Sequence, residues 1–172
     1  MGNATSPVEN LTNQEAIAKL KEIAEAARNC FFTTKINSNS PQTRPMALQE
    51  VCEQGNLWFI SSSESNKNDD IENDNDVQLY FQNNSKYEFL YVKGKASVHT
   101  DKETIDKYWT DFANAWFDGK DDPRVTILRI KPDEAYYYET KDSKFIAMSK
   151  MLLVAATGIK MEDGGVEGEL KI

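Results

Sequence analysis

The feature that most constrains the fold is a succession of short β-type segments joined by connections too short to cross a sheet. TRPMALQEVC (43–52) alternates between apolar and polar residues, and Gln54-Gly55-Asn56 leads directly into the apolar segment NLWFIS (56–61). Such a short connection joins antiparallel neighbours, because parallel strands need a crossover of about a dozen residues or more. The sequence therefore predicts a β-hairpin at 43–61.

Further segments have the same character. The expected strands are CFFTTKI (30–36), VQLYFQ (77–82), EFLYVKGKASVHT (88–100), and the pair VTILRI (125–130) and AYYYET (135–140), bent at Lys131-Pro132-Asp133. Polar turns follow the first of these at 37–41 and separate the next two at 83–86. Six or seven strands joined mostly by hairpins, with a helix at each end, predict a mainly β fold. We expect a small antiparallel barrel rather than a doubly wound sheet.

Helical spacing occurs at both ends of this strand-rich region. Thr12 and Glu15 form a capping-box pattern, and an apolar stripe from Ile17 to Ala27 predicts an amphipathic helix. A short polar helix fits between Asn66 and Asn75. Two more helices are expected, one carrying Ile105, Tyr108, Trp109, Phe112 and Trp116 on one face, and one from Ser143 to about Ala156.

A chain of 172 residues fits one domain of ordinary size. We expect a disordered leader at 1–11, a folded domain at 12–158 and a flexible, glycine- and acid-rich tail at 159–172. The segment 1–14 has neither a basic n-region nor an apolar h-region, and no eighteen apolar residues run together. We therefore expect a cytoplasmic protein with no membrane partner.

Composition excludes several classes of function. The net charge of −8 argues against nucleic acid, which requires a basic face, and against an anionic membrane surface. Cys30 and Cys52 are expected to be buried free thiols, and with the single His99 they do not form a metal site. The acidic run 69–76 lacks the mid-loop glycine and terminal glutamate of a calcium loop. Neither G-x-G-x-x-G nor G-x-x-x-x-G-K-[ST] occurs, so any phosphate must be bound through side chains.

The segment FISSSESNK (59–67) suggests how such a phosphate could be bound. Four serines follow an apolar strand, and Lys67 comes directly after them. Counted outward from the hairpin turn, Arg44 and Ser65 lie at the same open end, and a helix beginning near Asn66 would add amide donors. A phosphate cradle formed by Arg44, Ser65 and Lys67 is one interpretation. Ordinary surface cations beside a solvated turn are the other.

The order of four segments strengthens the first interpretation. TRPMALQE, GNLWFISSSESNK, DVQLYFQ and VKGKASV together resemble the pyridoxamine 5′-phosphate oxidase-like flavin-binding split barrels. The segment 109–139 is similar to the general stress protein branch of that superfamily, and the likeness extends over about 13–158. The resemblance implies a homodimer of split β-barrels that binds flavin mononucleotide (FMN), or FAD, between the subunits.

The resemblance also implies a set of cofactor-binding residues. Arg44, Pro45 and Met46 would lie along the flavin, Ile60, Ser61 and Ser62 would touch it from the second strand, Ser65, Asn66 and Lys67 would bind the phosphate, and Trp116 would be a lid from the second subunit. Asn66 stands where true oxidases carry arginine, and packing in the core is the alternative role for Trp116.

Two departures from the family pattern bear on activity. Gln49 replaces the lysine with which true oxidases hold the substrate phosphate, and the C-terminal GGVEGELKI lacks their Arg-x-His segment. Both argue against oxidation of pyridoxamine 5′-phosphate. The expected function is that of a flavin-dependent oxidoreductase acting on an unidentified small molecule. The alternatives are a non-catalytic flavin-storing or flavin-sensing stress protein and a cofactor-free dimeric interaction module.

Overall fold

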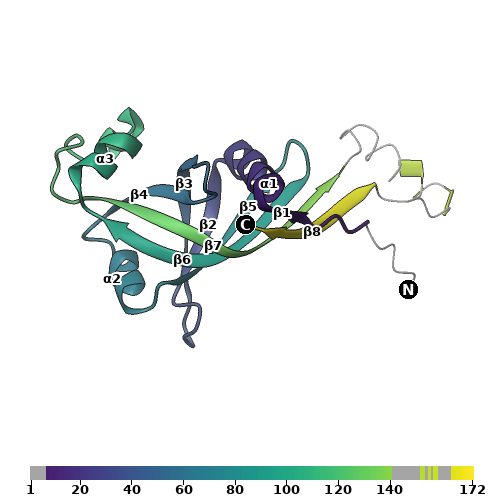
Figure 1. Cartoon of the computed structure of the whole chain (residues 1–172), viewed down its shortest axis with the longest axis horizontal. Helices are drawn as coiled ribbons and strands as arrows, with labels where there is room; N and C mark the ends of the chain where they lie inside the picture. Colours follow the sequence, from purple (N-terminus) through teal and green to yellow (C-terminus); the bar gives the residue numbers. More distant parts are fainter. Residues whose placement is uncertain (1–6, 141–151, 154, 156, 159–163) are drawn as a thin grey trace.

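The computed structural model describes residues 7–140, 152–153, 155, 157–158 and 164–172 (Figure 1). The strands are β1 (Leu11–Thr12), β2 (Asn29–Thr34), β3 (Gln42–Val51), β4 (Leu57–Ser62), β5 (Asp76–Asn83), β6 (Glu88–His99), β7 (Val125–Thr140) and β8 (Gly165–Lys171). The helices are α1 (Asn13–Ala27), α2 (Asn66–Asn73), α3 (Lys102–Tyr108) and the 3₁₀ helix η1 (Asp111–Ala115).

Six strands close into an antiparallel barrel. Their order is β7-β4-β3-β2-β5-β6, and β6 pairs with β7 to complete the ring. The predicted hairpin is β3–β4, with Val51 paired to Leu57 across the turn. The prediction of a mainly β, antiparallel barrel is therefore confirmed. α2 and α3 lie towards one end of the molecule, whereas β8 extends the sheet at the other (Figure 1).

The core fills the barrel and continues under α1. Inward-facing residues of neighbouring strands meet there, including Phe32 and Phe59, whose rings pack edge to face with centroids 5.6 Å apart. α1 buries Leu20 and Ile23 against this cluster, which accounts for the apolar stripe of its sequence. Thr12 is the N-cap of α1 as predicted, but its side chain makes no capping hydrogen bond.

The segments 125–130 and 135–140 form one strand rather than the predicted pair. β7 continues through Pro132 because that residue lies at a bulge in the β6–β7 pairing, where the register shifts between Lys93 and Gly94. Gly94 is required at this point, since a Cβ atom there would collide with the carbonyl of Lys131. Proline was read as a break in the strand, whereas the bulge accommodates it.

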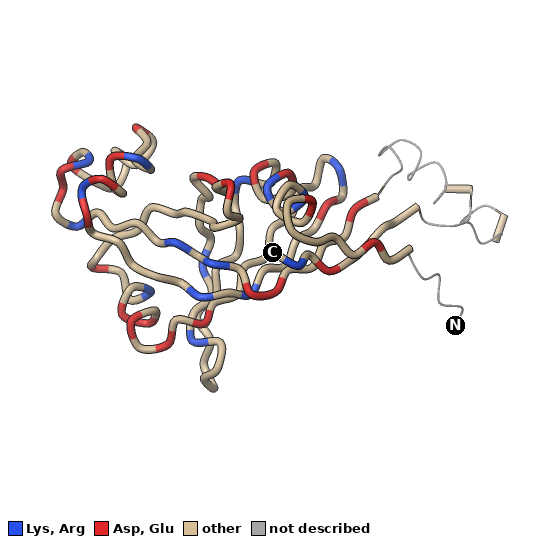
Figure 2. The backbone as a smooth tube through the Cα atoms, in the orientation of Figure 1, with Lys and Arg blue, Asp and Glu red and all other residues tan. Residues whose placement is uncertain are grey.

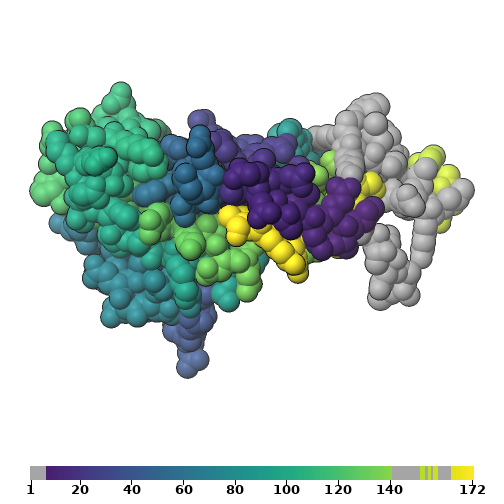
Figure 3. All heavy atoms as spheres, in the orientation of Figure 1, coloured from purple at the N-terminus to yellow at the C-terminus, as the bar shows by residue number. Residues whose placement is uncertain are grey.

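The expectation of a flexible tail is wrong for Gly165–Lys171, which form β8 and pair antiparallel with β7. The expected leader is also partly ordered, because Leu11 pairs with Leu170 on the other edge of β8. The close approach of this N-terminal segment depends on Gly168, where a Cβ atom would collide with the carbonyl of Glu9. Figure 3 shows the N-terminal segment and α1 packed against β8.

The predicted polar helix is α2, whereas the helix expected to carry Ile105 to Trp116 is two elements. α3 buries Ile105 and Tyr108, and the chain then becomes extended at Trp109 before η1 begins. The first two apolar residues cover the end of the barrel, so the chain turns away and leaves Trp116 at 61% exposure. The helix expected from 143 to 156 falls largely outside the described residues. Within the described part of the chain, no helix has the length and apolar character needed to span a membrane.

Candidate functional site

A cavity of about 330 Å³ opens between the β3–β4 hairpin, the start of α2 and the η1 segment, and we call it the hairpin cavity. Its lining residues are Pro45, Met46, Ala47, Gln49, Ile60, Ser61, Ser62, Lys67, Thr110, Phe112, Ala113, Trp116 and Phe117. Seven of the ten predicted cofactor-binding residues are among them, and Arg44, Ser65 and Asn66 are not. The walls are mainly apolar, and a polar end is formed by the last residues of β4 and the first turn of α2.

The Lys67 ammonium group forms the centre of this polar end. The residue is 8% exposed, and Nζ donates to Ser61 Oγ at 2.8 Å and to Ser65 Oγ at 2.9 Å. No carboxylate of the described residues lies within ion-pairing distance of it. Burial, and secondarily the positive charge of Arg44, lower the Lys67 pKa to about 8. A buried cation with hydroxyl partners alone is a suitable receptor for an anion.

A buried amide holds the serine beneath Lys67. Ser61 Oγ donates to Asn68 Oδ1 at 2.8 Å, and Asn68 Nδ2 donates to Thr126 Oγ1 of β7 at 2.9 Å. Ser61 and Asn68 are nearly inaccessible, with exposures of 4% and 3%. This chain of hydrogen bonds fixes α2 to the barrel and orients the Ser61 hydroxyl towards Lys67. Sequence reasoning missed Asn68 and Thr126, because they become neighbours only when β4 pairs with β7.

Arg44 lies close enough to Lys67 to lower its pKa, but its contacts are with other residues. Nη1 donates to Thr34 Oγ1 at 2.7 Å, and Nη2 lies 3.7 Å from Asp70 Oδ2. Thr34 Oγ1 in turn donates to Asp70 Oδ2 at 2.7 Å. The predicted meeting of Ser65 with Lys67 is thus seen directly, whereas Arg44 joins them as a nearby charge. Thr34 and Asp70 were not anticipated as its partners.

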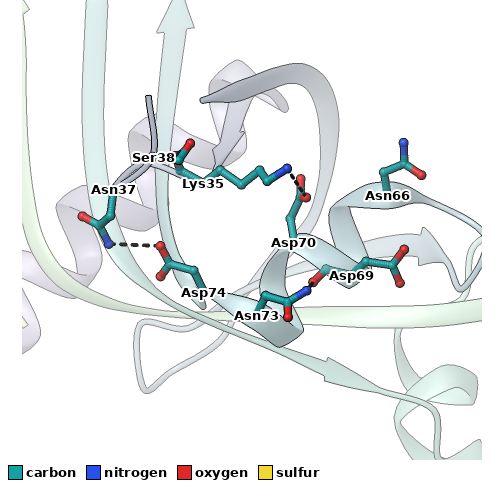
Figure 4. Close-up of a pocket in the computed structure, with 8 residues that line it drawn as sticks. All are labelled: Lys35, Asn37, Ser38, Asn66, Asp69, Asp70, Asn73 and Asp74. Carbon is teal, nitrogen blue, oxygen red and sulfur yellow. Dashed lines mark hydrogen bonds and ion pairs between the residues drawn. The ribbon is translucent and has the colours of Figure 1, made fainter. Parts of the chain in front are cut away.

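Asn66 belongs to a second hollow, which is shown in Figure 4 and which we call the acidic groove. This groove has a volume of about 500 Å³ and lies between the β2–β3 turn and α2. Its lining residues are Lys35, Asn37, Ser38, Asn66, Asp69, Asp70, Asn73 and Asp74. Asp and Glu residues are also concentrated along α2 in Figure 2. The predicted role of Asn66 in the phosphate cradle is therefore not supported by its position beside a different hollow.

Trp116 lines the hairpin cavity from within the same chain. Its ring packs edge to face on Phe112, with centroids 5.1 Å apart, and the exposures of these two residues are 61% and 68%. The alternative that Trp116 packs in the core is therefore wrong. Two exposed aromatic rings at the mouth of an apolar cavity provide a surface on which a planar ligand can stack.

The cavity has little capacity for acid–base chemistry. Among its lining residues in the described chain, Lys67 is the one side chain that titrates, and histidine and carboxylates are absent. Gln49 lies at another part of the wall, where its Oε1 accepts from Thr110 Oγ1 at 3.3 Å and its Nε2 donates to the Ala47 carbonyl at 3.1 Å. His99 lies elsewhere, against Trp58 with ring centroids 5.6 Å apart. Cys30 and Cys52 are buried free thiols, as predicted.

A barrel with this site defines a known class of protein. The family model described as pyridoxamine 5′-phosphate oxidase like matches residues 15–162, and the chain belongs to that family. It is 36% identical over 81 residues to general stress protein 26 of Bacillus subtilis, covering 45% of this chain and 58% of that protein. It is 32% identical over 105 residues to protein bli-3 of Neurospora crassa, covering 55% and 50%. The chain thus aligns with only about half the length of these curated relatives.

Solved structures share the fold. The general stress FMN/FAD binding protein from Xanthomonas citri superposes with a TM-score of 0.65 at 22% identity, over 76% of this chain and 93% of that one. At this level of identity the likeness establishes a common split-barrel fold.

Proposed function

We propose that the hairpin cavity binds a flavin through its phosphate, with FMN as the expected ligand and FAD as the alternative. The observation that carries this proposal is the Lys67 ammonium, buried with two serine hydroxyls and no carboxylate partner among the described residues. The flavin-binding description of the Xanthomonas citri protein supports the same assignment. A dianionic phosphate would supply the negative charge that Lys67 lacks.

The remaining predicted residues fit a ligand held in this way. Lys67, Ser61 and Ser65 would bind the phosphate, with Arg44 adding positive charge nearby. Met46 and Ile60 would contact the ring system, and Trp116 would cover it. The aliphatic and aromatic walls would exclude water from the ring, while the hydroxyls satisfy the charged end.

The most suitable activity is flavin-dependent oxidation or reduction of a small molecule. A bound flavin supplies hydride and electron transfer, and the protein then contributes orientation and electrostatics. The absence of histidine and carboxylates from the described cavity wall is compatible with such chemistry. It also favours a second candidate, a stress protein that binds flavin without turnover. At Gln49, a neutral amide offers no cation for a substrate phosphate.

We further propose that a second copy of the chain completes the site. Directly paired residues on five neighbouring strands form an outward-facing aromatic row, comprising Pro45, Phe31, Tyr80, Tyr91 and Tyr136. Phe31 and Tyr80 are 59% and 47% exposed, and Pro45 also lines the hairpin cavity. An exposed aromatic surface continuous with a ligand site is suited to a protein interface.

Titration of the purified protein with FMN tests flavin binding. We expect saturable binding with a perturbed flavin absorbance spectrum, and failure to bind FMN at tens of micromolar would contradict the proposal. Anaerobic addition of NADH or NADPH to the complex then separates the two candidates. Bleaching of the flavin followed by recovery in air would support the oxidoreductase, whereas an unreactive flavin would favour binding without turnover.

A further inference from the structure

The acidic groove and the hairpin cavity meet at the proposed phosphate end. Asn66 lines the groove, and the next residue, Lys67, lines the cavity. Asp70 lines the groove and also lies 3.7 Å from Arg44, the second cation of the proposed phosphate site. A ligand that continued beyond a phosphate at Lys67 and Arg44 would therefore encounter the groove.

The groove presents more negative than positive charge to such a ligand. Asp69, Asp70 and Asp74 contribute carboxylates, and Lys35 is its one cationic lining residue in the described chain. Lys35 is already paired with Asp70 at 3.4 Å, as Figure 4 shows. Asp74 accepts a hydrogen bond from Asn37 Nδ2 at 3.1 Å, which leaves its charge in place. Neither Asp69 nor Asp74 has an ion-pair partner among the described residues.

FMN and FAD differ at this position. FMN ends at one phosphate, whereas FAD continues through a second phosphate to adenosine. Resting on the proposed flavin site, we infer that Asp69, Asp70 and Asp74 are specificity-determining residues that make the protein select FMN over FAD. The second phosphate of FAD would lie beside carboxylates that no free cation offsets, and like charges at short range repel. The single phosphate of FMN would stop at Lys67 and Arg44.

Calorimetric titration of the full-length protein with FMN and with FAD at low salt tests this inference. Wild type should bind FMN about tenfold or more tightly than FAD, a difference of about 1.4 kcal/mol. The isosteric double variant Asp69→Asn/Asp74→Asn should narrow that ratio about fivefold or more, mainly through tighter FAD binding. Raising the salt concentration should also narrow the ratio in wild type, because exposed charges are screened.

Glu72→Gln is the matched control for the single variant Asp69→Asn. Glu72 is an exposed carboxylate on the same helix that does not line the groove, so its neutralisation should leave the ratio unchanged. Equal affinity of wild type for both flavins, or an unchanged ratio in the double variant, would overturn the inference while leaving flavin binding intact. If neither flavin binds, the proposed function fails and this inference fails with it.

Discussion

The Nζ atom of Lys67 lies 2.8 Å from the Oγ atom of Ser61, which joins the first turn of α2 to the end of β4. Both residues are buried, so the ammonium is held in place without a carboxylate. Burying a charge with neutral partners alone carries a free-energy cost. A bound anion would offset that cost, and the predictions below follow from it.

The Asn68 amide should stabilise the fold more than its neighbours on α2 do. Asn68→Ala removes both hydrogen bonds to Ser61 and Thr126 and leaves two buried hydroxyls without these partners. We expect a loss of about 1–3 kcal/mol in the free energy of unfolding, measured by urea denaturation. Asn73→Ala is the control, because Asn73 is exposed and bonds only to the Asp69 carbonyl among the described contacts. Equal losses in the two variants would contradict the role assigned to Asn68.

Binding of FMN should weaken as the pH rises above about 8. The Lys67 pKa in the free protein is lowered from 10.5 to about 8, mainly by burial, and a phosphate favours the protonated form. Affinity is therefore highest below pH 8 and should fall by up to about tenfold per pH unit above it. Riboflavin, which lacks the phosphate, should show little change between about pH 7 and 9.

Lys67→Arg provides a control for this pH dependence. Arginine stays protonated across the range, so FMN affinity in this variant should be nearly independent of pH. A parallel decline of FMN and riboflavin affinity in wild type would mean that another group titrates.

The part of the site formed by consecutive residues could be predicted from sequence. The hairpin and the helix after it follow from local patterns, and together they bring Ser61 and Ser65 to Lys67. The partners of Arg44 could not be predicted, because Thr34 reaches it through β2–β3 pairing and Asp70 through the packing of α2. These contacts depend on tertiary structure that no local pattern specifies.

β8 shows the opposite limitation of pattern reading. Its sequence GVEGELK is rich in glycine and acid and suggests a mobile tail, yet Val166 and Leu170 are buried. The glycine that weakens the strand pattern is the residue that lets the N-terminal segment approach. A position read as flexible was a close packing contact, and only the neighbouring strand reveals this.

The aromatic row should hold two subunits together. Sedimentation at micromolar concentration should give a species of twice the 19.5 kDa of one chain. Phe31→Asp places a charge in the middle of the row and should shift the protein to monomer by at least about tenfold in dissociation constant. Tyr87→Asp alters an aromatic residue that is 42% exposed in the β5–β6 turn, outside the row, and should leave the assembly unchanged. A wild-type monomer would contradict the interface.

Pyridoxamine 5′-phosphate should not be a substrate. Gln49 offers a neutral amide where a cation would be needed, and its amide is already engaged by Thr110 and the Ala47 carbonyl. With FMN added, aldehyde formation should stay far below the roughly 1–10 per second of an ordinary enzyme. Turnover at such a rate would show that the substrate phosphate is held by other residues.

The most direct test of the account is the affinity of Lys67→Ala for FMN and for riboflavin, measured beside wild type. A charge-assisted contact is worth about 1.5–3 kcal/mol, so FMN binding should weaken about tenfold or more. Riboflavin affinity should change by less than about twofold, because it lacks the phosphate, and Arg44→Ala should show the same pattern. Lys21→Ala, which alters an exposed lysine on α1, should affect neither ligand. Unchanged FMN affinity in Lys67→Ala and Arg44→Ala would contradict the phosphate site and leave the serine-lysine segment as a solvated turn.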